Sequence, residues 1–300
     1  MTFHLFGNIL TGYGVAANNR GENEGNITTL QKLLWQNEVR TTVSAEAIRW
    51  ALRYYWQTAK VDEENCQVNR QWNDEKNDNV WQDDYNSKSY IDDDVLGFMR
   101  AEGAKAESSA PPKGKKAKGT TTARRGVLEV TRAVSTLPFS GDITFNAASG
   151  QKGRTSLYGT EVHATRYQYG FALTPNRLTK QSRILPVLDG LISIGEVAGN
   201  HSRFLYDFSP ESIVLRWTHD FSPRLLYCFE ENKAGISAQT LCDRVQHGDI
   251  APEELWVAGA IAQTTTGEAL KELGVNVEDG IKPVAAQLKT KIAEDLGVGS

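Results

Sequence analysis

The 300-residue sequence has few of the features that mark membrane, secreted or disulfide-rich proteins. It has no apolar run of about 18 residues, so we predict no transmembrane helix. Its first ten residues lack the basic start and small-residue cleavage site of a signal peptide. Cys66, Cys228 and Cys242 are widely separated and odd in number, which argues against a disulfide framework. These absences predict a cytoplasmic protein that binds no membrane.

Motifs for cofactors and metals are also scarce. The chain has no Gly-x-x-x-x-Gly-Lys-Ser/Thr phosphate-binding motif, and polar residues follow Gly12-x-Gly14-x-x-Ala17 where a dinucleotide fingerprint needs a helix. The five histidines show no zinc-ligand spacing. Asp92-Asp93-Asp94 lacks the alternating oxygen ligands of a calcium loop and is expected to be a solvated acidic face. We therefore predict no cofactor and no metal site.

Two His-Asp pairs, His219-Asp220 and His247-Gly-Asp249, contain residue types that hydrolases use. No nucleophile elbow with Ser or Cys accompanies them, so each is predicted to be a surface or turn pair, and no catalytic residue is assigned. An RNA-processing nuclease that uses His201 or His219 remains the alternative, and it requires that cutting be lost when that histidine is replaced.

Charge is unevenly distributed along the chain. The formal net charge is −4, but residues 62–94 contain 11 acidic and 3 basic side chains, a net charge of −8. The rest of the chain therefore carries +4. A mildly basic body with an acidic insertion can still present a basic surface to a nucleic acid.

Hydrophobic periodicity predicts an α+β protein. Residues 12–29 read as a Gly/Asn-rich loop and residues 30–35 as a short helical turn. Without the insertion, the first elements follow the βαββαβ order of a ferredoxin-like, RRM-like domain. The predicted strands cover 2–11, 127–136, 155–173, 203–217 and 224–230, and the predicted helices cover 44–60, 182–194, 237–245, 265–273 and 281–295.

The helix over 44–60 has the clearest pattern. Ser44 is a suitable N-cap, because its hydroxyl can accept from a free backbone N–H of the first turn. Ile48 and Leu52 belong to an apolar stripe at helical spacing. Arg49 and Arg53 lie one turn apart on another side, which predicts a basic face that Trp56 and Lys60 continue.

Two segments interrupt the predicted domain. Residues 61–125 form an insertion, acidic over 61–100 and low in complexity over 101–125, where a flexible basic loop is expected. Residues 138–154 carry Ser-Gly and Lys-Gly pairs around a short apolar stretch, which predicts a hairpin or irregular arm.

Basic, amide and aromatic side chains gather in loops at one end of the predicted sheet. Such side chains supply phosphate contacts, base contacts and stacking surfaces for single-stranded nucleic acid. They are Arg20, Lys32 and Arg40 before the helix over 44–60, Arg49 and Arg53 on it, Lys152 and Arg154 with Phe145 and Tyr158 on the arm, and Asn200, His201 and Arg203 after the helix over 182–194.

The segments 18–27 and 38–53 resemble the DevR-type CRISPR-associated proteins of the RAMP superfamily, the crRNA-binding backbone subunits of type I Cascade. A basic residue, a serine, an acidic residue and a basic helix face match that family's motif, and the glycine turn over 195–203 is similar to its second glycine-containing segment. The resemblance covers about residues 1–60 and 125–230. The matching motif residues are Arg40, Ser44, Glu46, Arg49 and Arg53.

The resemblance implies a hand-shaped protein. The palm would be residues 1–60 and 126–300, the fingers 61–125 and the thumb about 138–158. The palm would grip crRNA phosphates through Arg40, Arg49 and Arg53, with Asn18, Asn19 and Arg20 close by.

The same resemblance implies a set of partners. Copies would stack head to tail along one crRNA in a helical filament, together with other Cascade subunits. The guide would be presented for pairing with target DNA, which the basic loop over 113–125 would touch. Backbone subunits of this type are not nucleases. Related type III subunits cut RNA with a loop aspartate, and residues 12–40 contain no Asp. A regulator that binds its own transcript remains a further alternative.

Overall fold

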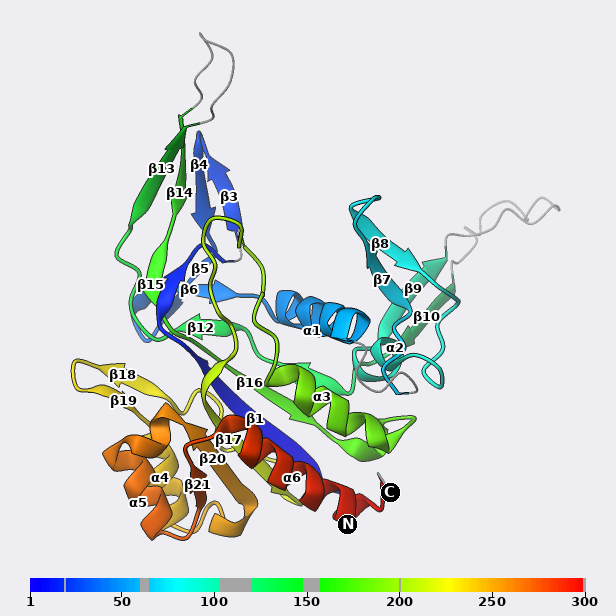
Figure 1. Cartoon of the computed structure of the whole chain (residues 1–300), viewed down its shortest axis with the longest axis vertical. Helices are drawn as coiled ribbons and strands as arrows, with labels where there is room; N and C mark the ends of the chain where they lie inside the picture. The colour runs from blue at the N-terminus through cyan, green and yellow to red at the C-terminus, as the bar shows by residue number, and fades with distance from the viewer. Residues whose placement is uncertain (19, 60–64, 103–119, 148–156, 200, 299–300) are drawn as a thin grey trace, which may run out of the picture.

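The computed structural model describes residues 1–18, 20–59, 65–102, 120–147, 157–199 and 201–298 (Figure 1). Within these residues the body of the protein is a nine-stranded sheet in which strands neighbour one another in the order β21-β20-β17-β1-β16-β12-β6-β5, and β11 also pairs with β16. Its strands are β1 His4–Thr11, β5 Lys32–Trp35, β6 Glu38–Val43, β11 Leu128–Val130, β12 Ala133–Ser135, β16 Tyr167–Leu173, β17 Pro210–Thr218, β20 Leu255–Gly259 and β21 Asn276–Glu278.

Strand β1 is the centre of this sheet. All eight of its residues are buried. Leu5 and Ile9 belong to the apolar core shared with α1, α3 and α6, whereas Phe6 and Leu10 belong to the core shared with α4 and α5. The strand is therefore apolar on both sides because helices cover both faces, and the strand predicted over 2–11 is confirmed. These helices are α1 Ala45–Ala59, α3 Ile184–Leu191, α4 Gln239–Gln246, α5 Thr265–Glu272 and α6 Ile281–Leu296.

Residues 12–35 differ from the prediction. The expected loop over 12–29 contains three strands, and the expected helical turn over 30–35 is strand β5, which pairs with β6. The three strands are β2 Gly14–Ala16, β3 Arg20–Glu24 and β4 Ile27–Leu30. Distant pairing accounts for β4, whose Ile27 lies opposite Gly159. By contrast, β3–β4 and β5–β6 are local hairpins, but β3 is exposed throughout and shows no alternation, and the β5–β6 turn places Gln36 and Asn37 at positive φ without glycine.

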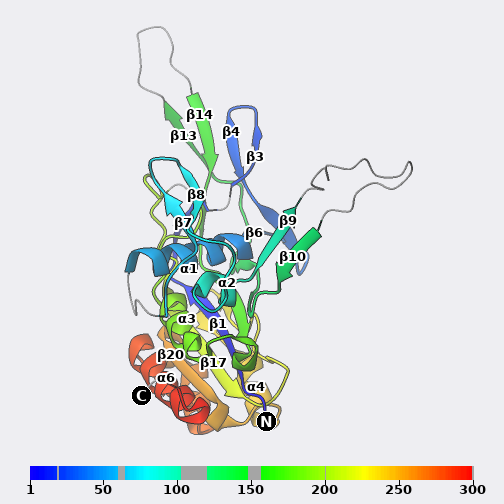
Figure 2. The same cartoon turned by 90° about the vertical axis from the view of Figure 1, so that its right-hand side faces the viewer.

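A second sheet projects from the body as a separate arm, seen in Figures 1 and 2. Its strand order is β13-β14-β4-β3, with β13 Ile143–Ala147 and β14 Leu157–Glu161. We call these four strands the hairpin arm. The arm predicted over 138–154 contains strand β13. Its pairing partner β14 begins at Leu157, beyond the predicted range. The hairpin arm thus combines two hairpins that are far apart in sequence.

Several predicted strands are shorter than expected. The strand predicted over 127–136 is divided into β11 and β12, and the strand over 203–217 begins only at Pro210. The strand over 155–173 is divided into β14, β15 and β16, and only Glu230 of the strand over 224–230 is extended within a strand. Neither β20 nor β21 was predicted. The remaining elements are β15 His163–Thr165, β18 Glu230–Asn232, β19 Gly235–Ser237 and the 3₁₀ turns Pro175–Arg177, Gln181–Arg183, Pro252–Glu254 and Ala260–Gln263.

The insertion consists, in its described part, of two hairpins and a short helix. The elements are β7 Arg70–Asn73, β8 Asp78–Trp81, α2 Ile91–Val95, β9 Phe98–Glu102 and β10 Thr120–Arg124. The second hairpin of the insertion, β9–β10, begins next to Gly97 and ends next to Gly126. Gly97 has φ +69°, and a Cβ there would lie 2.4 Å from the Arg124 carbonyl oxygen, so this close approach requires glycine.

The acidic helix α2 is buried, which corrects the expected solvated face. Asp92, Asp93 and Asp94 are each at most 2% exposed. Asp92 accepts hydrogen bonds from the backbone N–H groups of Asn69 and Arg70, at 2.8 and 3.0 Å. Asp93 accepts from the side chain of Asn69, at 2.9 Å, and burial raises the pKa of its carboxyl. These bonds compensate the carboxylates for lost water.

Asp94 joins the insertion to the body. Its carboxylate lies 2.8 Å from Nη1 of Arg183, and both side chains are fully buried. Arg124 of β10 pairs with the same carboxylate, and the backbone N–H of Thr179 donates to it at 2.8 Å. Part of the insertion's negative charge is therefore neutralised by arginines and backbone N–H donors within the chain rather than exposed to solvent.

Replacing Asp94 with Asn should lower the free energy of unfolding by about 3–5 kcal/mol, because Arg183 would be left buried without its counter-charge. Urea denaturation of the purified chain measures this. Glu129→Gln is the matched control, since Glu129 pairs with an Arg125 side chain that is 78% exposed, and it should cost less than about 1 kcal/mol. Equal effects of the two substitutions would contradict the prediction.

Candidate nucleic-acid interface

Helix α1 begins as the sequence predicts. The Ser44 hydroxyl accepts from the backbone N–H of Ala47 at 3.2 Å, which is the expected N-cap bond. Ile48 and Leu52 are fully buried and face the core. The cap and the apolar stripe therefore direct this helix onto the sheet beside β6 and β1.

The predicted basic face of α1 is covered by the insertion. Arg49 donates through Nη2 to the carbonyl of Leu96, and Nε of Arg53 lies 3.3 Å from a carboxylate oxygen of Asp92. Burial lowers the pKa of both guanidinium groups. The predicted basic face is therefore covered within the chain, because partners 39 or more residues away in sequence occupy both groups.

Trp56, which the sequence places on the same face of α1, is not exposed either. Trp56 is 2% exposed, and its indole N–H donates to the carbonyl of Pro186 at 3.1 Å. Lys60 lies outside the described residues. Arg40 is half-buried and donates to the carbonyls of Ser135 and Thr136, the first at 3.1 Å. Its guanidinium therefore fastens strand β6 to β12 and the chain that follows.

Two predicted segments do come together. The side-chain amide of Asn18 donates to the carbonyl of Val197 at 2.7 Å and is buried. Gly199, with φ +87°, lies so close to residue 18 that a Cβ would be 2.9 Å from its Cα. The glycine turn after α3 is thus packed on the segment after β1. Asn18 is used for this contact rather than displayed to solvent.

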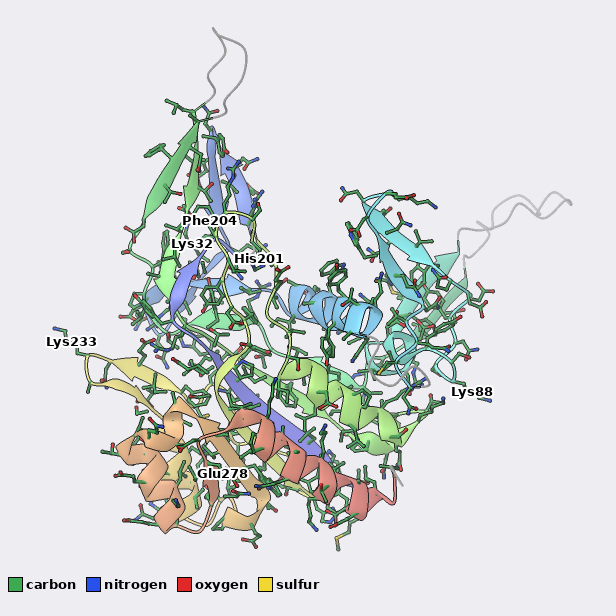
Figure 3. The ribbon with its side chains drawn as sticks, in the orientation of Figure 1. Lys32, Lys88, His201, Phe204, Lys233 and Glu278 are labelled. Carbon is green, nitrogen blue, oxygen red and sulfur yellow. The ribbon has the colours of Figure 1, made fainter. Side chains whose placement is uncertain are left out.

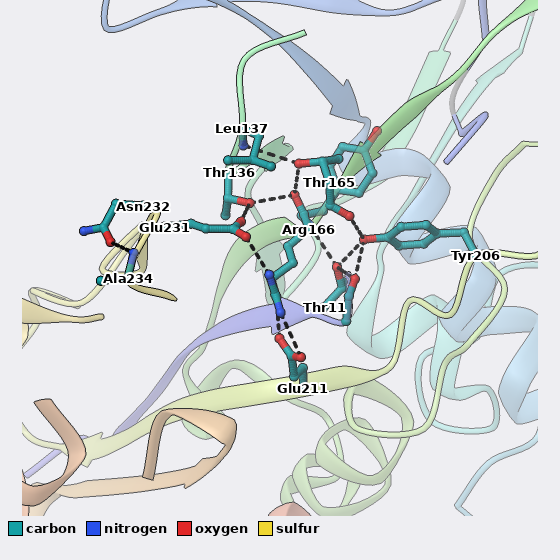
Figure 4. A network of polar contacts seen from close by, with 12 residues as sticks. Thr11, Thr136, Leu137, Thr165, Arg166, Tyr206, Glu211, Glu231, Asn232 and Ala234 are labelled. Atoms are coloured by element: carbon teal, nitrogen blue, oxygen red, sulfur yellow. Dashed lines mark hydrogen bonds and ion pairs between the residues drawn. The ribbon is translucent and has the colours of Figure 1, made fainter. Parts of the chain in front are cut away.

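The segment after β1 and the glycine turn after α3 meet at a junction that Tyr206 also holds. Figure 4 shows the Tyr206 hydroxyl next to Thr11 and Thr165. This hydroxyl lies 2.6 Å from Oγ1 of Thr11 and donates to the carbonyls of Gly12 and Thr165, at 2.9 and 3.2 Å. The ring is 1% exposed, and burial is the main reason that the pKa of its hydroxyl is raised. The end of β1 therefore positions the turn over 195–205.

Cationic side chains surround this junction. Arg20 and Arg203 are exposed, and the Arg203 guanidinium lies 5.1 Å from the ring centre of Tyr158 on the hairpin arm. Lys32 pairs with Glu161 at 2.5 Å and lies 4.6 Å from the ring centre of Phe139. An arginine over an aromatic ring stays available to phosphate on its outer side, whereas the Lys32 ammonium is shared with the Glu161 carboxylate.

His201 lies next to these side chains. It is half-buried, and both ring nitrogens are buried and lack a hydrogen-bond partner among the residues that the structure describes. In Figure 3 it lies between the base of the hairpin arm and the first turn of α1, with Lys32 on the arm side. We call Arg20, Lys32 and Arg203 the basic rim.

Four residues predicted to bind RNA lie outside the described residues: Asn19, Lys152, Arg154 and Asn200. Most of the basic loop over 101–125 also lies outside them.

The His-Asp pairs have structural partners, which agrees with their prediction as surface or turn pairs. His219 interacts through Nδ1 with the carbonyl of Thr2 at 3.0 Å, at the opposite end of β1 from the basic rim. Asp220 accepts from the backbone N–H of Ser222 at 3.0 Å and pairs with Arg216 and Arg224. The Ser222 bond and the arginines lower its pKa to about 2. This carboxylate therefore supports a loop.

No group of three or more His, Cys, Asp or Glu side chains within the described part of the chain is arranged to hold a metal ion. None of the described helices combines the length and apolar character needed to cross a bilayer.

Residues 13–241 match the family model described as "CRISPR-associated negative auto-regulator DevR/Csa2". The chain belongs to the DevR/Csa2 family. It is 47% identical to "CRISPR-associated protein Cas7/Cst2/DevR" of Myxococcus xanthus (strain DK1622), over 94% of this chain and 95% of that one. This confirms the resemblance found in the sequence.

Two solved structures share the fold of this DevR/Csa2 family member. A chain of a "CRISPR RNA-guided surveillance complex" matches with a TM-score of 0.55 and 14% identity, over 97% of this chain and 99% of that one. A chain of a "CRISPR RNA-guided surveillance complex, pre-nicking" matches with a TM-score of 0.58 and 11% identity, over 97% and 100%.

Two features of the interface were missed in the sequence. Tyr206 has no local signal, because its partners come from two other segments. The aromatic pair Trp50 and Tyr54 on α1 could have been found, since a spacing of four residues places two side chains together on a helix.

The stability contribution of Asp220 should depend on pH. Its pKa is lowered on folding, so its stabilisation is present above the unfolded-state value near about 3.9 and is lost as pH falls toward 2. Asp220→Asn should therefore destabilise the chain at pH 7, and the difference from the unsubstituted chain should shrink below about pH 4. Urea denaturation from pH 7 to pH 3 measures this; a pH-independent difference would contradict it.

Proposed function

We propose that this chain is a crRNA-binding backbone subunit of a type I CRISPR Cascade effector and is not itself an enzyme. Copies would line one guide RNA and present it for pairing with target DNA, beside other Cascade subunits in the cytoplasm. Family membership and the fold shared with two surveillance-complex chains support this proposal. The observation that carries it is the packing of residues 12–18 against the segments around Val197 and Tyr206, next to the basic rim.

The proposed palm is ferredoxin-like. Strands β17, β1, β16 and β12 are neighbours in that order, and each adjacent pair is antiparallel. Helix α1 follows β1, and α3 follows β16. With the strands between β1 and α1 set aside, this order supports the βαββαβ connection that we propose for the palm. The hairpin arm, which includes β3 and β4, would be the thumb. The insertion would be the fingers.

The proposed roles of the arginines follow from their partners. The basic rim would contact phosphates, because Arg20 and Arg203 are exposed and Lys32 is 27% exposed. Arg40, Arg49 and Arg53 would act by positioning β6 and the insertion, since each is bonded within the chain. Asn18 and Ser44 would position backbone in the same way. This is a narrower set of RNA contacts than the sequence predicts.

Head-to-tail stacking would be a heterologous contact, in which different surfaces of two copies meet and an open helical filament results. No cofactor or metal is proposed, because such a subunit acts through binding alone. Sequence would be read by base pairing, and the protein would hold the backbone of the guide.

Neutralising the basic rim should weaken RNA binding. For Lys32→Gln combined with Arg203→Gln, we expect a lower affinity for single-stranded RNA and a slope of log affinity against log salt that is shallower by about 1.4, or about 0.7 for each lost phosphate contact. Filter binding across a salt series measures both. Lys233→Gln is the matched control, because Lys233 is exposed on the β18–β19 turn (Figure 3) and should change neither quantity.

Expression of the chain with and without a repeat-spacer transcript tests assembly. We expect protected RNA of guide length and curved filaments in electron micrographs, with no cutting of added RNA. A nucleic-acid-free monomer that ignores the transcript would overturn the proposal. Cutting that is lost in His201→Ala or His219→Ala would instead identify the chain as a nuclease, and selective binding of its own transcript would identify a regulator.

A further inference from the structure

Helix α1 carries an aromatic cluster on its outer face. The rings of Trp50 and Tyr54 lie 5.3 Å apart with an angle of 8° between their planes. Trp72 of strand β7 meets Trp50 edge to face at 5.7 Å and 79°. Tyr54 remains 36% exposed, although a tyrosine in a core would be covered. Tyr54 is thus the exposed ring of the cluster, stacked on a half-buried Trp50 that also packs against the apolar core and is joined by Trp72 from the insertion.

The cluster is held in a fixed arrangement. Gln57 of α1 bonds the backbone of Trp72 twice: its amide donates to the carbonyl at 2.9 Å, and its side-chain oxygen accepts from the N–H at 2.8 Å. The indole N–H of Trp72 donates to Asp74 at 2.9 Å. Strand β7 is therefore anchored directly to α1, and the rings need no rearrangement to receive a ligand.

Charge on this face disfavours phosphate. Glu46 is exposed one turn before Trp50, and Asp74 lies beside Trp72. The two arginines within the described α1, Arg49 and Arg53, are bonded to the insertion. Ligands with a planar, uncharged ring suit these aromatic surfaces, whereas a polyanionic backbone would be repelled by the carboxylates.

The surroundings indicate which planar ring is bound. In Figure 1, α1 lies between the hairpin arm and the β7–β8 hairpin, which both project from the same side of the sheet. The first turn of α1 lies on the side of His201 in Figure 3, and Trp50 and Tyr54 follow within the next turns of the same helix. A single strand whose phosphates lie on the rim would reach the cluster with its bases.

We propose that Trp50, Tyr54 and Trp72 form a platform on which an unpaired base of single-stranded RNA stacks, with its phosphates turned away from Glu46. This inference rests on the proposed RNA-binding function and adds a base contact to it. Stacking on an aromatic side chain tolerates any base, because every base has a π face.

Tyr54→Leu tests the platform, because it keeps apolar bulk and removes the ring. We expect affinity for a short single-stranded RNA to fall about 5- to 100-fold. Since no phosphate contact is removed, the fold-change should be the same at low and high salt. Tyr54→Phe keeps the ring and should bind as the unsubstituted chain does. Phe221→Leu controls for loss of an exposed ring elsewhere, since Phe221 is 81% exposed beyond the end of β17.

A second measurement needs no substitution. The unsubstituted chain should bind an abasic RNA of equal length and charge less tightly than the normal RNA, and Tyr54→Leu should narrow that difference. Equal RNA binding by Tyr54→Leu and the unsubstituted chain would overturn the platform and leave the proposed function standing. Equal losses in the Leu and Phe variants, or a loss that vanishes at high salt, would also overturn it. Absence of RNA binding by the unsubstituted chain would overturn both.

Discussion

Burial of strand β1 on both faces is the constraint on which the rest of this structure depends. Alternate side chains such as Leu5 and Phe6 enter different cores, so helices must cover both sides of the sheet. The strand ends at Thr11, whose hydroxyl meets that of Tyr206. This bond, together with that of Asn18 to Val197, holds the glycine turn after α3 against the segment after β1. The basic rim thus stands on the end of the most buried strand in the body.

The uneven charge of the chain has a structural explanation at helix α2. Its three consecutive aspartates are buried, and their partners are backbone N–H groups, Asn69 and the guanidinium groups of Arg53, Arg124 and Arg183. A carboxylate that loses water needs such donors, so these bonds hold α2 against the rest of the insertion and the body. The acidic segment and the arginines of α1 therefore do not form separate negative and positive surfaces. Part of their charge is neutralised inside the protein, where Arg53 pairs with Asp92.

Prediction from sequence succeeded where the determinants are local. The five long helices were located, because periodicity and caps such as Ser44 act within a few residues. Strand β4 was missed because part of its pairing is set by the tertiary fold: Ile27 lies opposite Gly159. Strands β3 and β5 pair with the next strand along the chain, but β3 is exposed throughout and the β5–β6 turn lacks a glycine signal. The candidate site divides in the same way. Arg20, Lys32, His201 and Arg203 gather near the predicted loops, whereas Arg40, Arg49 and Arg53 are bonded within the chain.

The sequence by itself determined the central strand, the helix that begins after Ser44, the uneven charge and the family to which the chain belongs. Tertiary structure alone decided which cationic side chains face the solvent. The physical reason is that a guanidinium group is available to RNA only if no nearer acceptor takes it. For Arg53 that acceptor is Asp92, which is remote in sequence and is brought to α1 only when the insertion packs against it.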